Sequence, residues 1–267
     1  MVPRILVPTD FSSCADHASI EAIRLALKIG SRLTFIHFFS TPWVGSDTKL
    51  RFENSNRLHH HIVGLCEANQ LKLPLEVDYY SKSGNVREGL VHFIAHHRVS
   101  LVVMGTKGGG SLNARIFGSN TVHLIRNGYT PVLAIPENSS LFPIKTIVYG
   151  SDYSDVTGIT FDMVIKLAEL LQAKVTILHL HPSQGERHHA RDKFLDPDKR
   201  ILSHKDIEKV SIKSDDVIKG IREYVDQTKP SFLALSVKEE SNILAILRNS
   251  VFQTFILEAR LPILAAR

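Results

Sequence analysis

Two stretches of this chain repeat the same pattern of apolar and polar residues at a distance of roughly 130 residues, which is the length of a domain rather than of a solenoid unit. In each copy a short apolar run ends in aspartate, an aromatic residue and serine, and a second apolar run carries threonine and then histidine. The matching segments are 4–12 with 145–154, 33–38 with 175–180, and 130–135 with 261–266. The chain therefore looks like a duplicated domain.

Apolar strands and amphipathic helices alternate within the first copy. We predict strands at 4–8, 33–38, 75–81, 100–104 and 131–135, and helices at 13–29, about 47–69, 85–97 and 118–127. Such alternation implies a parallel sheet with helices on both faces. Residues 5–7 and 101–104 are apolar without alternation, which is typical of strands buried on both faces. The predicted fold class is α/β, with two tandem doubly wound, Rossmann-like domains, each a five-stranded parallel sheet flanked by helices.

The predicted domains are residues 1–138 and 143–267, joined by a linker that begins at Pro136. The second domain follows the plan of the first except at 182–206, which is polar and only weakly periodic. We expect that stretch to be an altered or partly disordered replacement for the second helix.

Three glycines follow the apolar run 101–104 at distinctive spacing. Gly105 and Gly108 are separated by two residues, and nine residues lie between Gly108 and Gly118. Glycine lets a backbone approach a ligand closely because it has no Cβ atom. Ser119 then opens an expected helix, whose free N–H groups and positive dipole end suit a phosphate. The spacing predicts a nucleotide site.

These residues together resemble the universal stress protein family in its tandem-domain form, across the whole chain. The specific part lies in the first half: Pro8-Thr9-Asp10 after the first strand, His37-Phe38 closing the second, and the glycine pattern after the fourth. The resemblance implies an adenine nucleotide alpha hydrolase-like fold. It also implies nucleotide contacts by Pro8, Thr9, Asp10, Phe38, Met104, Gly105, Lys107, Gly108, Gly118, Ser119, Asn120 and Thr121.

In the family's ATP-binding members the Pro-Thr-Asp segment after the first strand contacts the nucleoside. The backbone just after the histidine of the second strand contacts it as well. By resemblance, Met104 and Gly105 flank the ribose, and the later residues hold phosphates, with Lys107 adding charge. The ligand implied is ATP or another adenine nucleotide, with or without magnesium. Phe38 is larger than the small aliphatic residue common there. Each residue also has an ordinary reading: Asp10 or Ser119 as a helix cap, Gly105 as a turn, Lys107 as a solvated lysine.

The second half loses the glycine pattern. Ser236, Glu239 and Asn249 align with the three glycines, and Phe252 aligns with Thr121. The negative charge of Glu239 would lie where phosphates bind and would repel them. We therefore predict that the second half does not bind ATP in the family manner. The second half would serve another ligand, or act as a scaffold that pairs with the first. In the family, domains pair through their last strands, here 132–135 and 263–266. Association of two chains into a homodimer stays open beside this pairing.

The chain contains fourteen histidines. His179, His181, His188 and His189 gather at and after a strand end of the second half, where they would form a zinc site with Asp192 or His204, or be ordinary surface and core histidines. His92 and His96 have metal-ligand spacing without an HExxH pattern. The two cysteines, Cys14 and Cys66, are typical of small buried apolar residues.

The net charge of +5 is spread without runs of lysine or arginine, so no specific nucleic-acid partner is expected. No apolar run approaches the ~18 residues of a membrane span, and no leader pattern opens the sequence; a cytoplasmic location is expected. Three functions stay open. The first is a nucleotide-binding stress-response module that biases a conformation or a partner surface, and the second is a slow ATPase with Asp10 as candidate base. The third is a non-nucleotide binding protein that captures a small molecule or zinc in the second half. The sequence shows no Walker A, GxSxG or kinase signature, which weighs against an enzyme.

Overall fold

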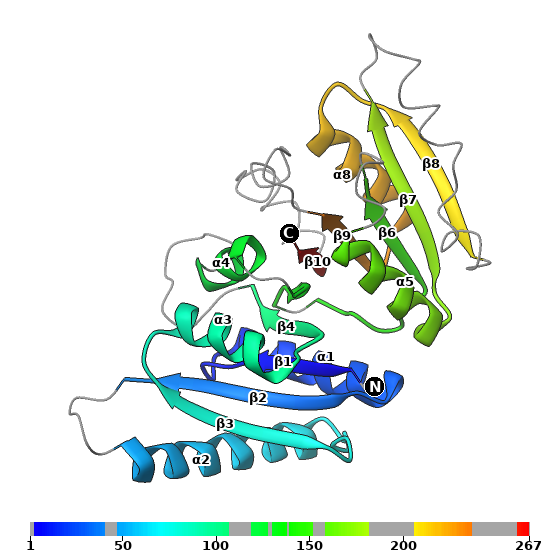
Figure 1. Ribbon diagram of the computed structural model, residues 1–267. Helices are drawn as coiled ribbons and strands as arrows, with labels where there is room; N and C mark the ends of the chain where they lie inside the picture. Colours follow the sequence, from blue (N-terminus) through cyan, green and yellow to red (C-terminus); the bar gives the residue numbers. More distant parts are fainter. Residues whose placement is uncertain are drawn as a thin grey trace. The chain divides into compact units, whose positions relative to one another are not determined.

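The computed structural model describes residues 3–40, 47–106, 119–127, 130–137, 139–151, 158–181, 206–236 and 261–266 (Figure 1). The chain divides into two compact units, residues 1–139 and 140–267. Strands and helices alternate through unit 1, as the repeat predicts, and they alternate in unit 2 over 146–181 and 207–236.

Unit 1 holds five parallel strands in the order β3-β2-β1-β4-β5. The strands are β1 (Arg4–Pro8), β2 (Arg32–Phe39), β3 (Val77–Ser83), β4 (Leu101–Gly105) and β5 (Val132–Ile135). The helices are α1 (Ser13–Ile29), α2 (Asp47–Ala68), α3 (Val86–His97) and α4 (Ser119–Asn127).

The central strands of unit 1 are buried along their apolar runs. Ile5, Leu6 and Val7 of β1 are at most 1% exposed, and all five residues of β4 are buried. This confirms that the unbroken apolar runs mark strands covered on both faces. β3 lies two residues later than predicted, because its pairing with β2 begins at Val77 while Leu75 is fully exposed.

Local sequence fixes where the helices begin and end. The Ser12 hydroxyl accepts the backbone N–H of Ala15 at 3.3 Å and so caps α1, and Gly30 ends the helix with a left-handed φ of 65°. Asn85 caps α3 by accepting the N–H groups of its first turn.

The winding of unit 1 reverses at β1, which pairs with β2 on one side and β4 on the other. α1 packs against α2, and α3 packs against α4. In sheets of this kind the carboxyl ends of the two strands at the reversal border a crevice, and ligands bind there. The crevice of unit 1 therefore lies after Pro8 and Gly105.

Unit 2 repeats this topology in its described part, with five parallel strands in the order β10-β9-β6-β7-β8. The strands are β6 (Thr146–Gly150), β7 (Lys174–His181), β8 (Ile207–Lys213), β9 (Phe232–Ser236) and β10 (Ile263–Ala266). The described helices are α5 (Ile159–Leu171) and α8 (Val217–Thr228). The predicted α/β fold class is confirmed; the polar stretch 182–206 lies outside the described residues except for Asp206.

Across the described helices, none is both long enough and apolar enough to cross a bilayer.

Candidate functional site

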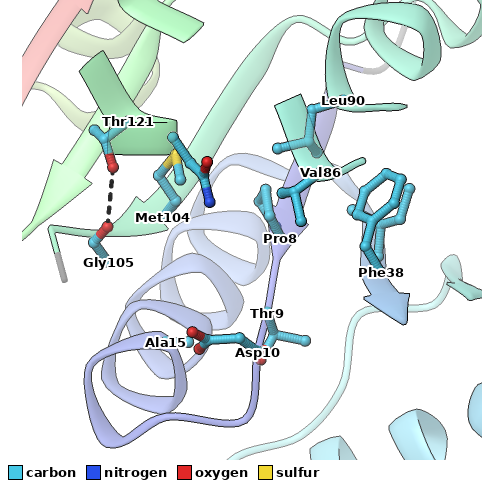
Figure 2. Close-up of a pocket in the computed structure, with 12 residues that line it drawn as sticks. Pro8, Thr9, Asp10, Ala15, Phe38, Val86, Leu90, Met104, Gly105 and Thr121 are labelled. Atoms are coloured by element: carbon cyan, nitrogen blue, oxygen red, sulfur yellow. Dashed lines mark hydrogen bonds between the residues drawn. The ribbon is translucent and has the colours of Figure 1, made fainter. Parts of the chain in front are cut away.

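A pocket of about 200 Å³ opens at the crevice of unit 1. Residues from both crevice strands, from the first turn of α1, from β2 and from the N-terminal turns of α3 and α4 form it (Figure 2). We call it the crevice pocket. Its lining residues are Pro8, Thr9, Asp10, Ala15, Ile36, Phe38, Val86, Leu90, Met104, Gly105, Asn120 and Thr121.

Eight of the twelve residues that sequence predicts for a nucleotide site line this pocket. They are Pro8, Thr9, Asp10, Phe38, Met104, Gly105, Asn120 and Thr121. Ser119 opens α4, but its side chain lies outside the described part. Lys107, Gly108 and Gly118 also lie outside the described residues. The structure thus brings together segments that are up to about 110 positions apart in the chain, as crevices of doubly wound sheets do.

The loop after β1 is tied down by four hydrogen bonds. The Thr9 hydroxyl accepts the N–H of Phe11 at 3.1 Å, while the Thr9 N–H donates to the Ile36 carbonyl at 2.9 Å. The ring Nδ1 of His37 donates to the Thr9 carbonyl at 2.9 Å, so the repeated histidine is a brace for this loop. Asp10 accepts the N–H of Ser12 at 3.1 Å through Oδ1.

Asp10 is therefore not the cap of α1, because Ser12 fills that position. Its carboxylate instead closes a side-chain turn before the helix, a common use of aspartate. Phe11, with φ of 62°, takes the left-handed conformation that this tight turn requires. Asp10 keeps an exposed position on the pocket wall.

Gly105 at the end of β4 is required by packing. A Cβ atom at this position would lie 2.8 Å from Sγ and 2.9 Å from the carbonyl oxygen of Cys14, in the first turn of α1. The Thr121 hydroxyl donates to the Gly105 carbonyl at 3.3 Å, joining α4 to the strand end (Figure 2). That hydroxyl proton is thereby engaged within the fold. The predicted hydrogen bond from Thr121 to a phosphate would need it to be released.

One side of the pocket is apolar. Phe38, Val86 and Leu90 form it, and we call this surface the α3 wall; Figure 2 shows it across the pocket from Gly105 and Thr121. The Phe38 ring lies so close to Gly89 that a Cβ atom there would meet ring carbons at 2.1 Å and 2.7 Å. The missing side chain at Gly89 therefore creates the space in which the large Phe38 ring is accommodated.

Sequence reasoning missed four lining residues, Ala15, Ile36, Val86 and Leu90. Periodicity could have found one of them, Ile36, and could have paired Val86 with Leu90 without placing them at the crevice. Ile36 lies two positions before Phe38 on the same strand and so shares its face, and Val86 and Leu90 are i, i+4 partners on α3. Which helix faces the crevice, however, depends on the order of the strands.

Unit 2 retains part of this arrangement. His179 donates through Nδ1 to the Ser151 carbonyl at 3.0 Å, as His37 does to Thr9. A Cβ atom at Gly220 of α8 would lie 2.2 Å from Leu180 of β7. Gly220 therefore makes room for Leu180 as Gly89 makes room for Phe38. Ser236 ends β9 where Gly105 ends β4. The aligned positions Glu239, Asn249 and Phe252 lie outside the described residues.

Histidines of unit 2 do not form a described metal centre. The rings of His179 and His181 lie 6.2 Å apart, and Nδ1 of His179 is already engaged with Ser151. His188 and His189, with which they would form the predicted zinc site, lie outside the described residues. Within the part of the chain that the structure describes, no group of three or more histidine, cysteine, aspartate or glutamate residues could hold a metal ion.

Both cysteines are free and buried, in keeping with the reading of small apolar residues. Burial, and secondly the charge of Glu67, raises the pKa of Cys66 above its ordinary value. A thiol with a raised pKa holds little reactive thiolate at neutral pH.

Comparison with known proteins supports the fold of the chain and the family resemblance of unit 1. A family model described as "Universal stress protein family" matches residues 1–136. No curated protein matches the sequence significantly. A universal stress protein from Archaeoglobus fulgidus is 13% identical with a TM-score of 0.70, over 99% of this chain and 96% of its own. A putative universal stress protein from Pseudomonas aeruginosa is 13% identical with a TM-score of 0.64, over 99% and 93%. At such identities the two structures show a shared fold.

Proposed function

The chain belongs to the universal stress protein family, and on that premise we propose that unit 1 binds ATP or another adenine nucleotide in the crevice pocket. Binding biases a conformation or a partner surface, with little turnover. The observation that carries the proposal is the convergence of eight predicted contact residues on one pocket at the winding reversal. Small-molecule sites in doubly wound folds occur at this point.

The chemistry of the pocket suits the parts of a nucleotide. The α3 wall offers an apolar surface to a purine base, since Phe38, Val86 and Leu90 present no polar side-chain group. On the other side, Gly105 lines the pocket at the end of β4, and Asn120 lies in the first turn of α4. The N–H groups of such a turn are free for phosphate oxygens.

Unit 2 is proposed to have no nucleotide site of this kind, which gives one site per chain. Ser236 replaces Gly105, and Glu239 would bring negative charge toward the phosphates. The proposal assigns residues 1–138 as the nucleotide-binding domain and 143–267 as a second domain with another role, acting in the cytoplasm.

The proposal is tested by calorimetric titration of the purified chain with ATP, ADP and AMP. Gly118→Glu introduces bulk and negative charge at the third glycine of the pattern, and we expect it to weaken ATP binding by more than about tenfold. Asn249→Glu, at the aligned position of the second half, is the matched control and should bind like wild type. Equal ATP affinity of Gly118→Glu and wild type would contradict the site.

The same material separates binding from catalysis. Mass spectrometry of small molecules and metals released on gentle denaturation identifies what the protein carries. ATP turnover that survives stringent purification and disappears in Asp10→Ala would show an ATPase instead of a binding module.

A further inference from the structure

Arg87 is a charged residue beside the crevice pocket that the glycine pattern does not include. It is the second residue of α3, between Val86 and Leu90, which line the pocket. Its Nε–H donates to Oδ1 of Asn120 at 3.3 Å. Asn120 lines the pocket from the first turn of α4, so this bond fixes the guanidinium at the side of the pocket where the two helices begin.

The charge of Arg87 is not neutralised within the described structure. Arg87 is exposed, and no carboxylate of the described residues forms an ion pair with it. The neighbouring Glu88 follows it on the helix and so points in another direction. With Nε bonded to Asn120, the two terminal nitrogens still offer four N–H donors in a plane. That planar group matches the oxygens of a phosphate.

Charges around the pocket are arranged with opposite signs. Asp10 is the acidic residue among the twelve that line it, and it comes from the loop after β1. Arg87 reaches the pocket from α3 through Asn120 of α4. A phosphate is repelled by the Asp10 carboxylate and attracted by the guanidinium. This arrangement favours one orientation of a nucleotide, with its phosphates toward Asn120.

Unit 2 offers an internal comparison for this position. α8 begins after Asp216 as α3 begins after Asn85, and Gly220 lies where Gly89 does. By this register Ile218 is the counterpart of Arg87. The cation is thus present in the unit with the glycine pattern and is replaced by an apolar residue in the unit without it.

We propose that Arg87 is a specificity-determining residue of the crevice pocket: its guanidinium, held by Asn120, binds phosphate oxygens and makes the site prefer phosphorylated adenosine to adenosine. The inference rests on the proposed nucleotide binding and adds a residue and a selectivity to it. Arg87 acts on the anionic part of the ligand, while the α3 wall contacts the base.

The test compares ATP and adenosine as ligands of the full chain by isothermal titration calorimetry, at low and high salt. Arg87→Gln retains hydrogen-bonding capacity but removes the charge, and we expect it to weaken ATP binding about tenfold while adenosine affinity stays within about twofold. The salt dependence of ATP binding should also decrease. Asn120→Ala, which releases the guanidinium, should shift ATP affinity in the same direction by less.

Arg222→Gln is the matched control, because it removes the same charge from an exposed residue of α8 in unit 2. It should leave both affinities unchanged. Arg87→Gln with unchanged ATP affinity, or with equal losses for ATP and adenosine, would overturn the role of Arg87 and leave nucleotide binding standing. Failure of wild type to bind any adenine nucleotide would overturn both.

Discussion

The two units share a scaffold and differ at the crevice. Both brace the first loop with a histidine, at 2.9 Å from His37 to Thr9 and 3.0 Å from His179 to Ser151. In both, a helix glycine makes room for the side chain after this histidine, Gly89 for Phe38 and Gly220 for Leu180. They differ where ligand phosphates would lie: Gly105 and Arg87 of unit 1 correspond to Ser236 and Ile218 of unit 2.

This contrast separates residues that the fold needs from residues that a ligand needs. The histidine braces and the helix glycines have packing or hydrogen-bonding roles that are visible without any ligand, so their presence in both units says little about function. Arg87 has no ion-pair partner among the described residues, and unit 2 folds without its counterpart. The differences between the units are therefore the better guide to function.

The largest effect is expected from converting Gly105 to its unit 2 counterpart. In Gly105→Ser the new Cβ atom meets Sγ, the carbonyl oxygen and the carbonyl carbon of Cys14 at 2.8 to 3.0 Å, and backbone atoms of a capped helix cannot move cheaply. We expect ATP binding to be lost and unit 1 to be destabilised by about 2 kcal/mol, within the range for overpacking. Calorimetry and denaturant unfolding measure the two effects.

Ser236→Gly is the reverse change in unit 2. It should cost about 1 kcal/mol or less, as a glycine in a strand does, and should create no nucleotide site because Ile218 and Glu239 remain. A second molecule of ATP bound per chain in this variant would show that a single glycine decides between the units. ATP affinity retained in Gly105→Ser would show that the packing of Gly105 against Cys14 is not needed for nucleotide binding.

An intermediate effect is expected at the paired helix glycines. Gly89→Ala forces the Phe38 ring away from α3 and into the pocket, which should weaken nucleotide binding about tenfold. Gly220→Ala displaces Leu180 by the same mechanism in unit 2 and should leave ATP binding unchanged. Hydrogen exchange of each unit reports whether both variants are strained to a similar degree. Equal ATP affinities in the two variants would argue against Phe38 as part of the site.

The repeat and the apolar runs were sufficient to predict the fold class and nearly every strand of unit 1, because strands buried on both faces leave an unbroken apolar signal. The predicted start of β3 was two residues too early because Leu75 is apolar yet exposed, and sequence cannot show that pairing starts only at Val77. Predicted domain limits, nucleotide contacts and the zinc cluster stay predictions.

The site was predictable where a motif carries it and not where topology does. Pro8-Thr9-Asp10 and Gly105 could be named because they lie at the carboxyl ends of strands or directly after them. Val86 and Leu90 could not, since their place depends on β3 and β4 lying on opposite sides of β1 in the sheet. The Arg87 hydrogen bond to Asn120 joins residues 33 positions apart on two helices, and no local pattern indicates it.

The smallest effect concerns alkaline stability and distinguishes the units through Tyr79. This tyrosine of β3 stacks on Phe35 at 5.9 Å, and its buried hydroxyl has no hydrogen-bond partner among the residues that the structure describes. Burial, and secondly Cys66, raises its pKa to about 12 from the ordinary 10.0. In unit 2 the matching position in the strand register is Lys209, paired with Ile177.

A raised tyrosine pKa stabilises the folded state below pH 10 and loses that contribution as pH rises toward 12, because the unfolded chain gives up its proton first. Since the residue is partly exposed, we expect unit 1 to lose on the order of 1 kcal/mol over this range. Tyr79→Phe should remove this part of the slope and change neutral-pH stability little, because no hydrogen bond is lost. Fluorescence of the single tryptophan, Trp43 in unit 1, follows unfolding in denaturant at each pH. An identical slope in wild type and Tyr79→Phe would mean that the Tyr79 hydroxyl ionises in the folded state as readily as in the unfolded chain.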